Sequence, residues 1–258
     1  MPTTLNIALI QTDLHWEDPT SNRKMFEEKI ASIPDDVDLI ILPEMFTTGF
    51  TMKPENVPLQ ESEGTFKWMK QISQQHYKAV MGSIVFEEKG KFFNRMFFVS
   101  PDGSVEVYDK KHTFTLAGED EVYEAGNKKS IFEYKGFKIC PMICYDLRFP
   151  VWSRNTEDYD VLIYMANWPK KRINAWDTLL RARAIENMAY CVGVNRTGKD
   201  GLDYEYPGHS GVYDVLGEPL AFSKDQTILY ATLNKEHIES TRKQLRFLED
   251  RDSFSWIG

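Results

Sequence analysis

The sequence predicts an α/β domain built around a mixed β-sheet. Three features indicate this class: short apolar runs, amphipathic segments between them, and hairpin turns that join some neighbouring runs. Residues 39–42 are four aliphatic residues stopped by Pro43, which is typical of a strand buried on both faces. Such strands alternating with helices build layered α/β domains, and the hairpins make the sheet mixed.

The first half of the chain begins this alternation. Residues 6–10 are predicted to be a strand, and residues 19–33 a helix with Ser21 or Asn22 as its N-cap, because apolar residues recur there at helical spacing. An apolar stripe over residues 65–77 predicts a second helix. A Pro-Asp-Gly turn then indicates antiparallel pairing among the strands of the middle section. These strands are predicted at residues 79–86, 92–99 and 105–108.

The second half repeats the pattern. A short helix is predicted at residues 150–154, a longer one at 176–187 and a late one at 236–249. Apolar runs predict strands at residues 137–143, 161–166, 190–194, 210–215 and 228–233, and Gly217-Glu218-Pro219 is the predicted turn between the last two strands, which close the sheet. No linker-like stretch or internal repeat divides the chain, so residues 1–258 are predicted to form a single domain.

Composition excludes several classes of protein. With 258 residues, 42% hydrophobic and 27% charged, the chain has ordinary globular usage and can bury a sizeable core. Its net charge of −8 argues against a nucleic-acid partner, because binding phosphates requires a clustered basic surface.

Localisation follows from what the sequence lacks. The longest apolar run, residues 161–166, is far shorter than the roughly 20 residues that span a bilayer, so no membrane partner is expected. No basic segment precedes the apolar residues 5–10, as a secretory signal would require. Three cysteines cannot all pair with one another, so we expect a reduced, cytoplasmic protein.

Cys144 is the candidate nucleophile. It follows directly on the predicted strand 137–143, and Pro150 can open a helix a few residues later. A nucleophile on such a turn is exposed at the sheet edge, with backbone N–H groups free to face an oxyanion. A small buried hydrophobe is the alternative, and it is the better explanation for Cys140 and Cys191, which lie inside predicted strands.

The sequence suggests several ways to activate Cys144. A Cys–His dyad with His112 or His209 stays open without support, and a metal site through Cys140 and Cys144 lacks further closely spaced ligands, so no metal is predicted. The other route is an adjacent cation that produces a thiolate, together with a carboxylate that moves protons.

Charged residues that follow other predicted strands could supply this cation and carboxylate. Glu44 comes just after the buried strand 39–42, at the end where ligand crevices open in α/β sheets. Lys110 and Lys111 follow the strand at 105–108. Taken singly, each could equally be an ordinary solvated charge.

Together these segments resemble the nitrilase superfamily of carbon–nitrogen hydrolases, over nearly the whole chain. The superfamily's Glu, Lys and Cys occur in that order, and Glu44, Lys110 and Cys144 match them in the segments Pro-Glu-Met-Phe, Tyr-Asp-Lys-Lys-His-Thr-Phe and Ile-Cys-Tyr-Asp-Leu-Arg-Phe-Pro. A second family Glu, seven residues before a Gly, matches Glu119. The resemblance implies a four-layer α-β-β-α sandwich with mixed sheets, and a homodimer.

Further segments are similar to the omega-amidase branch of this superfamily. They are Ala166-Asn167-Trp168-Pro169, Arg172, Trp176, residues 179–187, Val194-Asn195-Arg196-Thr197-Gly198 and Asp200-Gly201. The resemblance implies hydrolysis of the ω-amide of short 2-oxo acid amides, such as 2-oxoglutaramate and 2-oxosuccinamate, through a thioester. Another carbon–nitrogen hydrolase (a nitrilase, an N-carbamoyl hydrolase or an aliphatic amidase) is an alternative, and so is a catalytically silent binding protein on the same scaffold.

The resemblance also assigns roles to individual residues and requires no cofactor. Glu44 would take the thiol proton of Cys144, while Lys110 and the backbone N–H of Tyr145 would stabilise the oxyanion. Glu119 would orient the substrate or Lys110.

The small-molecule amide substrate carries a carboxylate, which an arginine holds best. Arg148, Arg172 and Arg196 are the candidates, although Arg196 could instead pair with Asp200 or Asp203. We favour Arg172, because its segment, with Trp168, can form a wall of the crevice.

Overall fold

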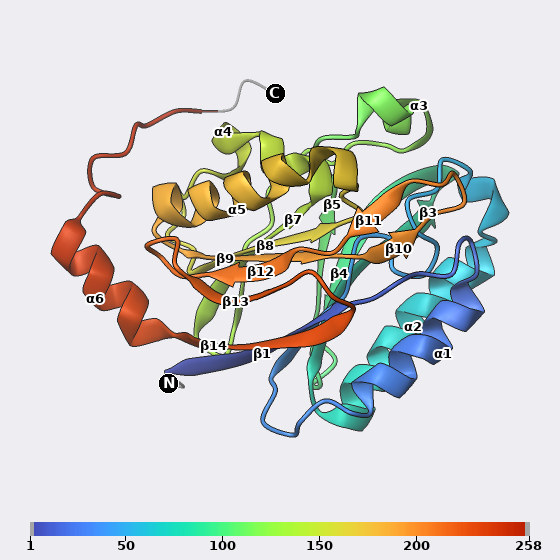
Figure 1. The fold of residues 1–258 in the computed structure, drawn as a ribbon, viewed down its shortest axis with the longest axis horizontal. Helices are drawn as coiled ribbons and strands as arrows, with labels where there is room; N and C mark the ends of the chain where they lie inside the picture. Colours follow the sequence, from blue (N-terminus) through green and yellow to red (C-terminus); the bar gives the residue numbers. More distant parts are fainter. Residues whose placement is uncertain (1–2, 256–258) are drawn as a thin grey trace.

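In the computed structural model, which describes residues 3–255, two mixed β-sheets pack face to face and helices cover the outer face of each (Figure 1). The ends of the predicted domain, residues 1–2 and 256–258, lie outside the described residues. Alternate residues of the first strand face opposite ways: Ile7 packs between the sheets with Ile139 and Ile163, whereas Ala8 packs against helix residues such as Phe26. The predicted four-layer α-β-β-α sandwich is therefore confirmed.

The first sheet carries strands from both halves of the chain. β1 pairs in parallel with β2, and β2 with β3, while β4 and β5 continue the sheet as antiparallel hairpins and β14 pairs antiparallel with β1. In spatial order its strands are β14 (Thr227–Asn234), β1 (Thr4–Gln11), β2 (Leu39–Ile41), β3 (Ala79–Glu88), β4 (Lys91–Val99) and β5 (Val105–Asp109).

The second sheet has a parallel centre with antiparallel edges. β7, β8 and β9 run parallel, and β6, β12 and β13 pair antiparallel around them. In spatial order its strands are β13 (Pro219–Ser223), β12 (Ser210–Tyr213), β9 (Tyr190–Asn195), β8 (Val161–Ala166), β7 (Phe137–Ile143) and β6 (Phe132–Tyr134). A separate hairpin is formed by β10 (Thr197–Lys199) and β11 (Glu205–Pro207).

The helices complete the outer layers. α1 (Pro19–Ile30) and α2 (Leu59–His76) cover the first sheet, whereas α4 (Pro150–Ser153) and α5 (Ile173–Asn187) lie over the second (Figure 1). The bounds of the two remaining helices are Glu119–Val122 for α3 and Lys235–Leu245 for α6. Figure 1 shows α6 at one end of the sandwich, beyond the layers formed by the other helices.

The predicted helix ends need several corrections. The N-cap of α1 is Asp18, not Ser21 or Asn22: the Asp18 side chain accepts from the backbone N–H of Ser21, and Pro19 occupies the first helical position. α1 and α6 end earlier than predicted, whereas α5 begins earlier, at Ile173. α2 begins six residues before the predicted start, because no capping side chain marks its N-terminus and its first turn is largely exposed.

The C-terminal strands do not form one closing hairpin. Residues 210–215 contribute β12 to the second sheet, whereas β14 belongs to the first sheet. The predicted turn at Gly217-Glu218-Pro219 instead leads into β13, whose outward-facing residues are too exposed to leave a strong apolar signal. An apolar run shows that a strand is buried but does not show which of two sheets it joins.

Candidate active site

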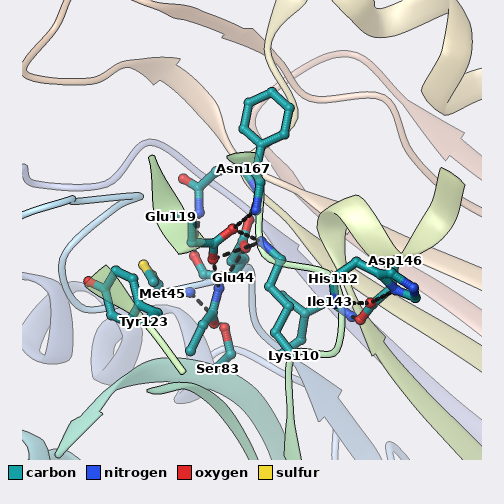
Figure 2. A network of polar contacts seen from close by, with 12 residues as sticks. Glu44, Met45, Ser83, Lys110, His112, Glu119, Tyr123, Ile143, Asp146 and Asn167 are labelled. Carbon is teal, nitrogen blue, oxygen red and sulfur yellow. Dashed lines mark hydrogen bonds and ion pairs between the residues drawn. The ribbon is translucent and has the colours of Figure 1, made fainter. Parts of the chain in front are cut away.

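The carboxylate of Glu44 is fully buried where the two sheets meet. The chain leaves β2, and Met45 adopts a left-handed conformation (φ 43°) directly after Glu44. The Glu44 oxygens accept hydrogen bonds from the backbone N–H of Asn167 (2.8 Å), the side-chain amide of Asn94 (2.8 Å) and the ammonium of Lys110 (2.9 Å; Figure 2). These contacts come from both sheets, so Glu44 is held in one position.

Lys110 lies between two carboxylates. Its Nζ is 2.9 Å from Glu44 and 2.8 Å from Glu119, and all three side chains are at most 1% exposed. Burial alone would lower the pKa of Lys110, but Glu119 and Glu44 outweigh it and raise this pKa. Lys111 points elsewhere: its ammonium lies 5.6 Å from the centre of the Trp152 ring. The structure therefore places Lys110, and not Lys111, in the cluster.

Glu119 completes this cluster from the start of α3. Besides Lys110, its carboxylate accepts from the backbone N–H of Phe114 at 2.6 Å. Burial raises the pKa of Glu119; Lys110 opposes this rise and Glu44 adds to it. Two carboxylates around one ammonium thus form a site that has affinity for an additional proton.

Cys144 opens the turn that follows β7. It is the first residue of a 3₁₀ turn, Cys144–Arg148, and has a left-handed backbone (φ 44°), a conformation that non-glycine residues adopt at a cost. Burial first, and then the charge of Glu44, raise the pKa of the Cys144 thiol well above its usual range, although Lys110 lowers it. The adjacent lysine alone therefore does not favour a resting thiolate, so the carboxylate that the sequence hypothesis paired with this cation is needed to accept the thiol proton.

A cavity of about 290 Å³ opens onto Cys144 and Lys110. The predicted binding residues Tyr145, Trp168 and Arg172 all line it, whereas Glu119 lies behind Lys110. The remaining lining residues are largely aromatic or aliphatic. They are Phe50, Met52, Phe114, Leu116, Ala117, Arg148, Asn167, Pro169, Asp200, Leu202, Tyr204 and Tyr206.

The three candidate arginines differ in their position relative to the cavity and in their partners. Arg172 lies over the ring of Phe114 (5.0 Å) and Arg148 over that of Trp168 (5.0 Å); both line the cavity, and neither has an ion pair within residues 3–255. Arg196 is fully buried and outside the cavity lining. Its guanidinium pairs with Asp13 at 2.7 Å, and not with Asp200 or Asp203 as the sequence suggested.

Sequence reasoning missed two amide side chains that organise the carboxylates. Asn94 donates to both Glu44 (2.8 Å) and Glu119 (3.2 Å) from the middle of β4. Asn167 donates its side-chain N–H to the backbone oxygen of Glu44 at 2.6 Å, in addition to its backbone contact with that carboxylate. A buried polar residue within the apolar run 92–99 was the available signal for Asn94.

Among residues 3–255, no three His, Cys, Asp or Glu side chains gather in a way that could hold a metal ion. In the same part of the chain, no helix combines the length and apolar character needed to cross a membrane.

Comparisons with known proteins show the family to which this chain belongs. The model of the carbon-nitrogen hydrolase family matches residues 6–243. The chain is 42% identical to the omega-amidase YafV of Yersinia enterocolitica over 97% of this chain and 98% of that protein, and 31% identical to a 2-oxoglutaramate amidase of Bacillus subtilis over 95% and 96%. A CN-hydrolase superfamily protein from Xanthomonas campestris, with an arsenic adduct in its active site, superimposes with a TM-score of 0.95 at 36% identity, covering 98% of this chain and 99% of that one. The chain belongs to the carbon-nitrogen hydrolase family.

Proposed function

We propose that this protein is an omega-amidase, which hydrolyses the ω-amide of short 2-oxo acid amides to the dicarboxylate and ammonia. The proposal rests on one observation: Cys144 and Lys110 line the same cavity as two arginines, Arg148 and Arg172. Neither arginine has an ion pair with an acidic side chain within residues 3–255. An amide carbonyl can reach the thiol while a carboxylate on the same molecule reaches a guanidinium. The two relatives described above, an omega-amidase and a 2-oxoglutaramate amidase, support this substrate class.

The proposed reaction uses Cys144 as nucleophile and Glu44 as general base. Because the raised pKa keeps Cys144 protonated, Glu44 accepts the thiol proton as the sulfur attacks the amide carbonyl. Lys110 and the backbone N–H of Tyr145 stabilise the resulting oxyanion. Glu44 then transfers the proton to the departing nitrogen, so the C–N bond breaks, ammonia leaves and a thioester remains.

Water completes the cycle. Glu44 accepts a proton from water as its oxygen attacks the thioester, and the C–S bond breaks when that proton returns to the sulfur of Cys144. The carboxylic acid product then leaves. We propose that Glu119 keeps Lys110 in place through its two hydrogen bonds, at 3.0 and 2.8 Å, rather than contacting the substrate.

Arg172 is the proposed site for the substrate carboxylate. Arg172 is half-buried and lines the cavity, and its backbone carbonyl accepts the indole N–H of Trp168 at 2.8 Å, which fixes this turn. A charge-assisted bidentate contact is worth about 1.5–3 kcal/mol, so Arg172→Ala should raise KM for 2-oxoglutaramate roughly ten- to a hundredfold.

The test compares ammonia release from 2-oxoglutaramate, glutamine, an uncharged amide of similar length and simple nitriles. Preference for 2-oxoglutaramate, lost in Arg172→Ala, is the expected result. Lys170→Ala is the matched control, because Lys170 occupies the same turn, is exposed and pairs with Glu205 outside the cavity. Equal losses on charged and uncharged amides would make Arg172 structural, and preference for a nitrile would reject the omega-amidase assignment.

We further propose that residues 1–258 act as a single domain in a cytoplasmic homodimer. The family resemblance supports the dimer, and the three cysteines, none of which is in a disulfide, suit a reducing compartment. Light scattering coupled to gel filtration measures the oligomeric state, and a monomeric mass would reject the dimer.

A further inference from the structure

We propose that Asp146 is a positioning residue, whose carboxylate fixes the segment that carries Lys110 against the turn that carries Cys144. The inference rests on the roles proposed above for these two residues. Asp146 does not line the cavity, so it would act through the groups that it holds rather than on the substrate.

The carboxylate of Asp146 is fully buried and accepts four hydrogen bonds. Oδ1 accepts from the backbone N–H of His112 (3.0 Å) and contacts the ring Nδ1 of the same residue (2.8 Å). Oδ2 accepts from the hydroxyl of Tyr108 (2.8 Å) and from the backbone N–H of Ile143 (3.0 Å). Each oxygen therefore has two partners, and Figure 2 shows the contacts of Asp146 with His112 and Ile143 beside the network around Glu44.

The origin of these partners points to a role in catalysis. Tyr108 and His112 lie two residues before and two residues after Lys110, and Ile143 directly precedes Cys144. The carboxylate thus holds both flanks of the proposed oxyanion-stabilising residue and the residue before the proposed nucleophile. Three of the four contacts come from residues that flank Lys110, and the fourth, from the backbone N–H of Ile143, caps the turn that Cys144 opens.

The two networks have complementary tasks. Glu44 and Glu119 hold the ammonium of Lys110, at the end of a long and flexible side chain. Asp146 holds the backbone that follows that residue through the N–H of His112, and it holds Tyr108, which precedes Lys110, through the side-chain hydroxyl. Because Cys144 and Lys110 must both approach one carbonyl group, their separation has to be fixed at both the backbone and the side-chain end.

The groups that bind Asp146 are themselves held in place. The indole N–H of Trp152 donates to the hydroxyl of Tyr108 at 3.0 Å, and the ring of His112 stacks on Phe149 with centroids 3.6 Å apart. Both Phe149 and Trp152 come from the segment that follows the Cys144 turn, so the contacts again join the two proposed catalytic segments.

Asp146→Asn tests the inference with little change in shape. An amide retains one acceptor oxygen, and its NH₂ group would face two donors, so one side of the network is lost. We expect kcat to fall by roughly 10- to 100-fold, the scale of a misplacement of about 1 Å in an active site. KM should change by less than about threefold, because Arg172, the proposed carboxylate-binding residue, does not belong to this network.

Asp160→Asn is the matched control for loss of a buried carboxylate. Asp160 is also buried, accepts from the backbone N–H of Lys138 (2.8 Å) and pairs with Lys235 and Arg242, on elements that do not line the cavity. It should lower the melting temperature while kcat stays near the wild-type value. A loss of kcat in Asp146→Asn no larger than in Asp160→Asn, at a similar change in melting temperature, would overturn the inference.

Tyr108→Phe provides a second test of the proposal in case Asp146→Asn does not fold. It removes one donor to Asp146, and we expect a smaller fall in kcat at constant KM; an unchanged kcat contradicts the proposal. Kinetics are measured on whichever amide the wild type hydrolyses best. A wild type inactive on 2-oxoglutaramate but active on another amide rejects the proposed substrate, whereas an active wild type with unaffected variants rejects only the role of Asp146.

Discussion

Replacing Lys110 by methionine removes a buried cation while keeping a side chain of similar length. In the wild type its ammonium lies 2.9 Å from Glu44 and 2.8 Å from Glu119, with all three groups essentially inaccessible to solvent. Breaking a buried pair from one side costs about 3–5 kcal/mol, because the partner charge stays uncompensated. Here one carboxylate can take up a proton instead, so we expect the free energy of unfolding to fall by about 3 kcal/mol, and the melting temperature by roughly 6–12 °C.

This loss should depend on pH in a defined direction. Without Lys110, burial and mutual repulsion raise the pKa of one carboxylate above its unfolded value of about 4.3. At pH values between the pKa in the unfolded chain and the raised pKa in the folded variant, the folded protein keeps a proton that the unfolded chain releases. The stability of the variant therefore falls as pH rises through this range. The deficit of Lys110→Met relative to wild type should thus be largest near pH 7 and should shrink as pH falls towards about 4.3.

Activity provides the second measurement. Losing one oxyanion donor costs about 10²–10³ in kcat, and we expect at least this loss in ammonia release by Lys110→Met. Lys111→Met is the control, since that ammonium lies over an indole ring and outside the cluster. Melting curves by circular dichroism at several pH values accompany the assay. Wild-type activity in Lys110→Met, or a severe loss confined to Lys111→Met, would refute the reasoning.

Three further predictions concern other parts of the structure. Cys144→Ser should fold but lose amidase activity, whereas Cys140→Ala should keep it; the reverse ranking contradicts the assignment. Burial raises the pKa of Cys140 to about 12, so the unfolded chain releases this proton first. Above about pH 9 this one thiol should lower the free energy of unfolding by up to about 1.4 kcal/mol per pH unit, and the total slope, to which the other buried thiols also contribute, should be smaller by that share in Cys140→Ala. In Gly126→Ala the new Cβ would lie 2.1 Å from the backbone oxygen of Asp109, so the segment that carries Lys110 must shift. Both kcat and stability should therefore fall. An unchanged kcat would show that this segment tolerates displacement.

Local patterns in the sequence predicted most strands, because burial on both faces leaves continuous apolar runs such as residues 39–42. They did not predict how strands divide between the sheets. β12 and β14 are close in sequence, yet they belong to different sheets, and this choice depends on packing between distant segments. Helix starts were missed where capping was weak, as at Pro58 before α2.

The candidate site shows the same division between local and long-range information. Glu44, Lys110 and Cys144 could be proposed as members of one site because each follows a strand within a recognisable motif, and the structure brings them together. The sequence favoured Arg172 for the substrate carboxylate, but it could not show that Arg196 is paired elsewhere, because its partner Asp13 is distant in the chain. Asn94 was missed since its two carboxylate partners are brought to it only by the folded sheets.

The pairing of β1 with β14 affects how the protein folds during its synthesis. Residues 4–11 align with residues 227–234, so the first sheet gains this edge strand only after the whole segment between the two strands has been synthesised. Until then β1 presents unpaired backbone N–H and C=O groups, a surface on which strands of other chains can add. Pairing over so long a separation also slows folding. The emerging chain is therefore most prone to aggregation, and most in need of a chaperone, after β1 has been synthesised and before β14 pairs with it.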